Sequence, residues 1–249
     1  MRRSGDDAAV IASRVLRTWG ESESGLNERL DDIISELEGP DTPTLAFLAS
    51  GWEGLKIRLT AKAANTVIAA AQLDEWEARL RAELGDLVFG IDDDTMESVV
   101  LDQCRRAGFT LGAAESVTGG LLGGRLTGVP GSSDVFAGSS VSYDARIMRA
   151  VLGGSVGPVV TVSASREMAH GAQAVLGVDV AMSLTGVAGP TEQDGQPAGT
   201  LFVGLVGPGF DDVVPVRLPG QREQMRQFSV ITALGLLRTR LDDIASDQV

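Results

Sequence analysis

The stretch LGAAESVTGGLL, residues 111–122, decides how the second half of the chain is interpreted. An apolar run ends at Ala114, the polar residues Glu115, Ser116 and Thr118 follow, and two glycines then open an apolar helical segment. A strand that turns into a helix in this way directs hydroxyls and backbone N–H groups at one point, where they can hold a phosphate or an oxyanion. The pattern alone fits an ordinary capped helix equally well.

Short apolar runs alternate with helical patterns around this stretch. The runs are residues 109–114, 178–184 and 200–206, and the helical patterns are about residues 119–127, 163–176 and 222–241. A further helix is predicted behind the possible N-caps at 92–95. Such alternation is typical of a layered α/β domain and predicts a ligand site at the carboxyl ends of the strands.

The first part of the chain has a different pattern. Residues 8–37 predict helix with an interruption at 20–25, and a Gly-Pro break follows at 39–40. Strands are predicted at 44–50 and 55–60, where apolar and basic residues alternate in the second. A helix over about 64–84 and a short apolar run at 87–89 complete a small α+β unit.

Two other segments could contribute to a site. Tyr143, the only tyrosine, follows a Ser-rich segment, and a phenol can donate or relay a proton, although a lone tyrosine is more often a packed aromatic. TGVAGP (185–190) is a Gly-rich turn after an apolar run, a weak signal by itself. Arg222 and Arg226 open the last helix and could bind a phosphate, but a solvated helix face is the stronger interpretation.

Composition excludes several classes of protein. The formal net charge of −13 disfavours binding to nucleic acid and to anionic membranes. Cys104 is the only cysteine, so an internal disulfide is impossible. His170 is the only histidine and lies in a predicted helix, where we expect a surface residue. A hydrolase on this chain is therefore expected to work without histidine.

The sequence predicts a cytoplasmic protein. No apolar stretch reaches the ~20 residues that are needed to span a bilayer. The first residues, MRRSGDDAAVIASRV, contain two aspartates and no proper apolar core, so we do not interpret them as a signal peptide.

Five segments of the second half together resemble one known family. They are AESVTGGLLGGRLTGVPGSS (114–133), VSYDARIMRAVLGG (141–154), LTGVAGP (184–190), PAGTLFVGL (197–205) and PGQREQMR (219–226). In order and spacing they are similar to the carboxyl-terminal domain of the CinA/PncC family, over about residues 94–241. The resemblance implies an amidase that hydrolyses nicotinamide mononucleotide to nicotinate mononucleotide and ammonia. We expect neither a cofactor nor a metal.

The first half resembles the KH-like domain that precedes the amidase domain in full-length CinA proteins. The similar segments are TPTLAFLASGWEGLKIRLTAKA (42–63) and LGDLVFGIDDDTMESVV (84–100). Residues 14–24 and 27–34 resemble the segment that leads out of a still earlier, molybdopterin-binding-like domain, which we expect to be absent. We predict a helical leader at 1–40, a KH-like α+β domain at 41–92 and a three-layer α/β/α amidase-like domain at 93–249.

The resemblance implies a Ser-Tyr-Lys type of site. Ser116 matches the nucleophile, whose hydroxyl would attack the carboxamide carbon and form an acyl-enzyme. Tyr143 matches the family tyrosine, and N–H groups near Thr118 and Gly119 would stabilise the oxyanion. Arg222 matches a family arginine and is expected beside the nucleotide phosphate. The residues expected to bind substrate are Thr118, Gly119, Gly120, Thr185, Gly186, Gly189 and Arg222.

The lysine of the family pattern SYxxxxK is missing, because Met148 stands in its place. A neutral amine can take a proton, whereas a thioether cannot. Arg146 and Arg149 lie nearby, but a guanidinium stays protonated and is a poor base. Val117 replaces the family's cysteine, and two loops also depart from the family pattern. These departures predict weakened or altered catalysis.

Three hypotheses therefore stay open. The first is a nicotinamide-nucleotide amidase, weakened by Met148. The second is a catalytically inactive relative that serves nucleotide sensing or assembly. The third, nucleic-acid binding through the KH-like unit, is disfavoured by the net charge and by the absence of a GxxG loop at 61–66. Relatives suggest a homo-oligomer, and nicotinamide mononucleotide is the expected partner rather than nucleic acid or a membrane.

Overall fold

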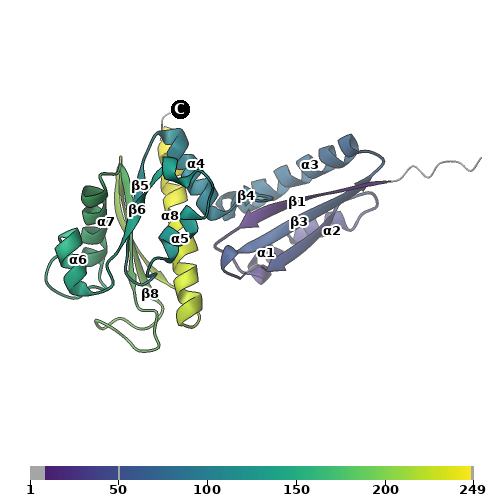
Figure 1. Ribbon diagram of the computed structural model, residues 1–249. Coiled ribbons are helices and arrows are strands. Elements are labelled where there is room, and N and C mark those ends of the chain that lie inside the picture. Colours follow the sequence, from purple (N-terminus) through teal and green to yellow (C-terminus); the bar gives the residue numbers. More distant parts are fainter. Residues whose placement is uncertain (1–8, 50, 248–249) are drawn as a thin grey trace, which may run out of the picture. The chain divides into compact units, whose positions relative to one another are not determined.

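The computed structural model describes residues 9–49 and 51–247, without the side chain of the last of these. The chain divides into two compact units between Thr95 and Met96. Each unit is built on its own sheet, of four strands in the first and five in the second (Figure 1). The domain boundaries predicted after residues 40 and 92 stay a prediction. The first eight residues of the predicted helical leader lie outside the described residues.

The first unit is an antiparallel sheet with the strand order β2-β3-β1-β4. Its strands are β1 (Val10–Thr18), β2 (Thr44–Ala49), β3 (Leu55–Ala63) and β4 (Val88–Ile91), and its helices are α1 (Glu23–Arg29), α2 (Asp31–Leu37) and α3 (Thr66–Leu84). Along β3, the buried Ile57 and Leu59 alternate with the exposed Arg58, so one face of the sheet contacts the core. Leu26, Leu73 and Leu80 of the helices belong to that core. The predicted small α+β domain is confirmed.

One predicted element of this unit is wrong. A helix was expected over residues 8–19, but within the described part of this range the chain forms β1, which pairs antiparallel with β3 from Val10 to Thr18. The strand lies between β3 and β4 in the sheet, and its β-branched residues Val10, Ile11 and Val15 suit a pleated surface. Helix is confirmed only for the later part of the segment, in α1 and α2.

The second unit is a mixed sheet with the strand order β6-β5-β7-β8-β9. Its strands are β5 (Leu111–Glu115), β6 (Phe136–Val141), β7 (Val180–Gly186), β8 (Thr200–Gly207) and β9 (Phe210–Arg217). Its helices are α4 (Met96–Ala107), α5 (Leu121–Thr127), α6 (Ala145–Leu152), α7 (Val162–Leu176) and α8 (Arg222–Asp247). Helices α6 and α7 cover one face of the sheet and α4, α5 and α8 the other (Figure 1). The predicted three-layer α/β/α domain is confirmed.

The central strands of this sheet explain the position of the site. β5 and β7 are buried on both faces, as their apolar sequences require, and β5 is parallel to both β6 and β7. The carboxyl ends of these three strands therefore meet at one edge of the sheet. β8 and β9 continue the sheet antiparallel, and Pro215 is accommodated because β9 is an edge strand. No helix in the described part of the chain combines the length and apolar character that a membrane span requires.

Candidate active site

A cavity of about 170 Å³ lies where β5, β6 and β7 end. Ser116 follows β5, Tyr143 follows β6 by two residues, and Gly186 ends β7. All three line the cavity, together with Gly189 and Arg222. The parallel order of the strands thus brings together residues that are far apart in the sequence, at the edge where open α/β sheets bind ligands.

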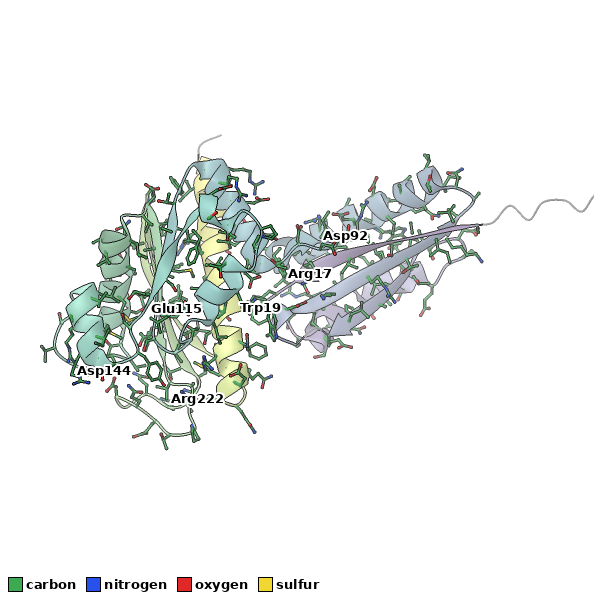
Figure 2. All side chains as sticks on the ribbon, viewed as in Figure 1. Arg17, Trp19, Asp92, Glu115, Asp144 and Arg222 are labelled. Atoms are coloured by element: carbon green, nitrogen blue, oxygen red, sulfur yellow. The ribbon has the colours of Figure 1, made fainter. Side chains whose placement is uncertain are left out.

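Glu115 shapes the turn that carries Ser116. Its carboxylate is fully buried, and Oε2 accepts hydrogen bonds from Thr118 Oγ1 at 2.8 Å, Gly120 N at 2.9 Å and Leu122 N at 3.0 Å. Oε1 accepts from Gly123 N at 2.8 Å. Figure 2 labels this side chain within the body of the domain. The carboxylate caps α5, so the first amides of that helix are occupied and do not form an open phosphate site.

The other amides of the turn have different partners. Ser116 N donates to Leu184 O at 3.0 Å, and Gly119 N donates to Ser116 O at 3.2 Å. Within the described residues, the N–H groups of Val117 and Thr118 have no acceptor, and Ser116 Oγ makes no hydrogen bond. Val117 lines the cavity, so its amide is available to a ligand, whereas Thr118 is fully buried and does not line the cavity.

Arg222 connects two walls of the cavity. It donates from Nη2 to Tyr143 Oη at 3.0 Å and from Nη1 to Gly189 O at 3.1 Å. Its guanidinium extends from the first residue of α8, near the lower end of that helix in Figure 2. Because the phenol oxygen accepts from Arg222, its own proton remains available for donation to a bound molecule.

Asp144 fixes the start of α6 directly after Tyr143. It is the N-cap of this helix and accepts from Arg146 N at 2.7 Å and from the Arg146 side chain at 3.1 and 3.0 Å. The Arg146 guanidinium lowers the pKa of Asp144 from 3.8 to about 2. The cap therefore stays ionised throughout the neutral range and keeps the segment that carries Tyr143 in place.

Thr185 and Gly186 have structural constraints of their own. Thr185 is fully buried and its hydroxyl donates to Val159 O at 2.7 Å, so it does not line the cavity. A Cβ at Gly186 would lie 2.4 Å from Thr200 O, so only glycine fits there. Thr118, Gly119 and Gly120, also expected to bind substrate, do not line the cavity either.

No residue of the polar loop after the Gly189 turn was among the expected site residues, although Thr191, Glu192 and Gln193 line the cavity. Asp194 fastens this loop, since its Oδ2 accepts from Val159 N at 2.8 Å and Val160 N at 3.1 Å. Glu192 is the one carboxylate among the lining side chains. Its position after a turn was the only signal in the sequence.

Met148 lies outside this cavity. It is 3% exposed and packs with Ala114, Leu152 and Met168 in an apolar cluster between α6 and α7. It lines a second cavity of about 150 Å³, which shares Val159 with the first. Among the described residues, no group of three or more His, Cys, Asp or Glu side chains could hold a metal ion.

The fold and the site define a KH-like α+β domain followed by a three-layer α/β domain, with a ligand cavity at the ends of its parallel strands. The chain belongs to the CinA family: it matches the CinA C-terminal domain over residues 93–241 and the damage-inducible protein CinA KH domain over residues 13–90.

Relatives extend over nearly the whole chain. A CinA-like protein of Frankia casuarinae is 40% identical over 254 aligned residues, which cover 100% of this chain and 58% of that protein. A putative competence-damage inducible protein of Moorella thermoacetica is 38% identical over 238 residues, covering 92% of this chain and 55% of the relative. The chain thus spans little more than half the length of these curated relatives.

Solved structures of this superfamily align with about as many residues as the second unit contains. A competence-damaged protein (CinA) superfamily protein of Klebsiella pneumoniae has a TM-score of 0.57 at 27% identity, covering 59% of this chain and 96% of that structure. The corresponding superfamily protein of Escherichia coli has a TM-score of 0.55 at 26% identity, covering 63% and 98%.

Proposed function

We propose that this protein is a slow nicotinamide-nucleotide amidase that converts nicotinamide mononucleotide and water to nicotinate mononucleotide and ammonia. The observation that carries the proposal is the cavity that gathers Ser116, Tyr143 and Arg222. At about 170 Å³ it is smaller than typical ligand pockets of about 300–1,000 Å³, so it would hold the carboxamide end of the nucleotide rather than all of it.

The reaction uses a hydroxyl, a proton donor and an anion partner. Ser116 Oγ bonds to the carboxamide carbon, the C–N bond breaks, and the serine proton leaves with the nitrogen as ammonia. Tyr143, within reach of the ligand, relays that proton. Water then attacks the acyl-enzyme, releases the carboxylate and restores the hydroxyl. Arg222, which lines the cavity, pairs with the phosphate.

The reaction is expected to be slow because position 148 carries no base. A well-placed general base contributes about 10²- to 10⁴-fold to a rate. Met148 supplies none, and Ser116 Oγ makes no hydrogen bond to a base within the described residues. The same two observations favour a second candidate. In this alternative the protein is a catalytically inactive relative that binds the mononucleotide and serves nucleotide sensing or assembly.

Ammonia release and calorimetric binding with nicotinamide mononucleotide separate the two. We expect wild type to bind and to release ammonia slowly, and Ser116→Ala to release none. Met148→Lys should gain at least about 10-fold if the buried amine has the lowered pKa that a base at neutral pH requires. Binding without any Ser116-dependent ammonia would establish the second candidate instead.

A matched control comes from the same apolar cluster. Met168 is as buried as Met148 but lies on α7, so Met168→Lys adds a lysine to the same core without matching the family position. It should show no gain. An equal gain in both variants, or one that persists after Ser116→Ala, would contradict the assignment of position 148.

A further inference from the structure

We infer that Glu192 is a specificity-determining residue, whose carboxylate makes the cavity favour a carboxamide over the corresponding carboxylate. The inference rests on the proposed function and deepens it, because it names the chemical group that the same cavity selects. Under that function the two groups belong to the substrate and to the product, which are otherwise identical.

The loop that carries Glu192 is fixed to the wall of the cavity. Gln193 N donates to Gln196 O at 3.0 Å, and Gln196 N donates back to Gln193 O at 2.8 Å. Between them Asp194 and Gly195 have φ values of 54° and 75°, which suit the tight turn of a hairpin. Asp194 Oδ2 accepts hydrogen bonds from two backbone N–H groups of the cavity lining. Glu192 therefore directly precedes a closed turn that is attached to the site.

The carboxylate of Glu192 is not used by the protein itself. Glu192 lines the cavity and is exposed, and within the described part of the chain its side chain makes no hydrogen bond and no ion pair. Arg222, the one cationic side chain in the same lining, donates to Tyr143 Oη and Gly189 O instead. An exposed carboxylate is ionised at neutral pH. The negative charge of Glu192 is therefore left to act on the ligand.

A carboxamide and a carboxylate interact with this charge in opposite ways. The NH₂ of a carboxamide donates to a carboxylate, and such charge-assisted hydrogen bonds are the stronger kind. A ligand carboxylate has no donor and carries the same charge as Glu192. A sphere with the volume of the cavity is only roughly 7 Å across, less than the Debye length of about 8 Å in physiological salt, so salt does not screen the repulsion. The cavity therefore combines attraction for the amide with repulsion of the acid.

The rest of the ligand does not contribute to this preference. Nicotinamide mononucleotide and nicotinate mononucleotide carry the same phosphate, ribose and positively charged ring, so Glu192 acts equally on these parts in both. Of these parts, an anion attracts the ring and repels the phosphate. We therefore expect Glu192 to face the ring end of the ligand, which Ser116 attacks. The product carboxylate then forms beside a like charge, which favours its release.

The test is calorimetric binding of the two mononucleotides to the full chain with Ser116→Ala, in which hydrolysis does not interfere. Glu192→Gln and Glu192→Ala are added to this parent, and both remove the charge. Asp134→Asn is the matched control, because it removes one negative charge from an exposed side chain of the same unit that does not line the cavity. Ammonia release from nicotinamide mononucleotide is measured in parallel with wild type.

We expect the parent to bind the amide at least about 10-fold more tightly than the acid, as a hydrogen bond to a charged group allows. Both Glu192 variants should reduce this preference to less than about threefold, mainly by binding the acid more tightly, whereas Asp134→Asn should keep it.

Four results would contradict the reasoning at different points. A parent without the preference, a preference that survives both Glu192 variants, or an equal loss in Asp134→Asn would overturn the inference and leave the amidase intact wherever wild type releases ammonia. A preference that depends on Glu192, without ammonia release from wild type, would support the inference and overturn the amidase alone. Binding of neither mononucleotide would overturn the inference, and if wild type also releases no ammonia it would overturn the proposed function as well.

Discussion

Replacing Glu115 by glutamine should destabilise the second unit and disturb the Ser116 turn. The buried carboxylate accepts four hydrogen bonds, three at Oε2 and one at Oε1. Glutamine keeps one acceptor oxygen and places an NH₂ donor at the other position. If its oxygen takes the Oε2 position, the three donors there keep a partner, but Gly123 N then faces a second donor.

The magnitude follows from these contacts. One unsatisfied buried donor costs about 1–3 kcal/mol, and the three remaining hydrogen bonds lose the strengthening that a charged acceptor gives. We expect a loss of about 2–4 kcal/mol for Glu115→Gln. Glu115→Ala leaves all four donors without this acceptor, so we expect a loss above about 4 kcal/mol.

Urea denaturation of the full chain, followed by far-UV circular dichroism, measures the loss in the free energy of unfolding. If the two units unfold in separate transitions, each transition is fitted separately. Asp134→Asn is the control, because it also exchanges a carboxylate for an amide in the same unit, but at an exposed side chain. It should stay within about 0.5 kcal/mol of wild type. If Glu115→Gln does the same, the carboxylate is not what holds this turn together.

Two further predictions concern the rim of the two cavities. Arg222→Ala should weaken calorimetric binding of nicotinamide mononucleotide about 10- to 100-fold, since hydrogen bonds to a charged group contribute about 1.5–3 kcal/mol, and unchanged affinity would exclude this arginine as the phosphate ligand. The pKa of Glu167 is lowered from 4.5, chiefly by the hydrogen bond from Ser155 N. The ionised Glu167 therefore stabilises the fold fully above pH 4.5, and this stabilisation is lost as the pH falls through the lower folded pKa. In melting curves from pH 7 to pH 3, the difference between wild type and Glu167→Gln should therefore be constant near neutrality and vanish at the acid end; a difference that grows on acidification would reverse the sign of this reasoning.

Strong local patterns made most of the fold predictable. The apolar runs of β5, β7 and β8 are buried on both faces, and the capped helices α3, α4 and α7 end at glycines with positive φ. β6 and β9 were not predicted. β6 is short and rich in glycine and serine, and β9 contains two aspartates and a proline, so pairing at the sheet edges rather than local propensity makes them strands.

In β1, too, sheet pairing rather than local propensity determines the structure. Its alanine, leucine and arginine residues favour a helix locally, but pairing with β3 along its whole length determines the strand. At the candidate site, the parallel strand ends made the grouping of Ser116 and Tyr143 predictable. The partners of Glu115 were not predictable, and neither were the hydrogen bonds from Arg226 to Val117 O and Thr118 O. A buried carboxylate and an exposed one, or a hydrogen-bonded guanidinium and a solvated one, have the same letter in a sequence.

The order in which the cavity is assembled follows from how far apart its walls are along the chain. The cavity-lining residues Arg222 and Tyr143 are 79 positions apart, and the turn that carries Ser116 is held by a contact between Arg226 and Thr118 that spans 108. Contacts of such long range form only after the intervening strands have paired, since loop closure must precede them. We therefore expect a partly folded chain to have no half-formed pocket with residual affinity. We expect a ligand of this cavity to bind only the complete second unit, so saturating concentrations should raise the melting temperature of that unit by mass action.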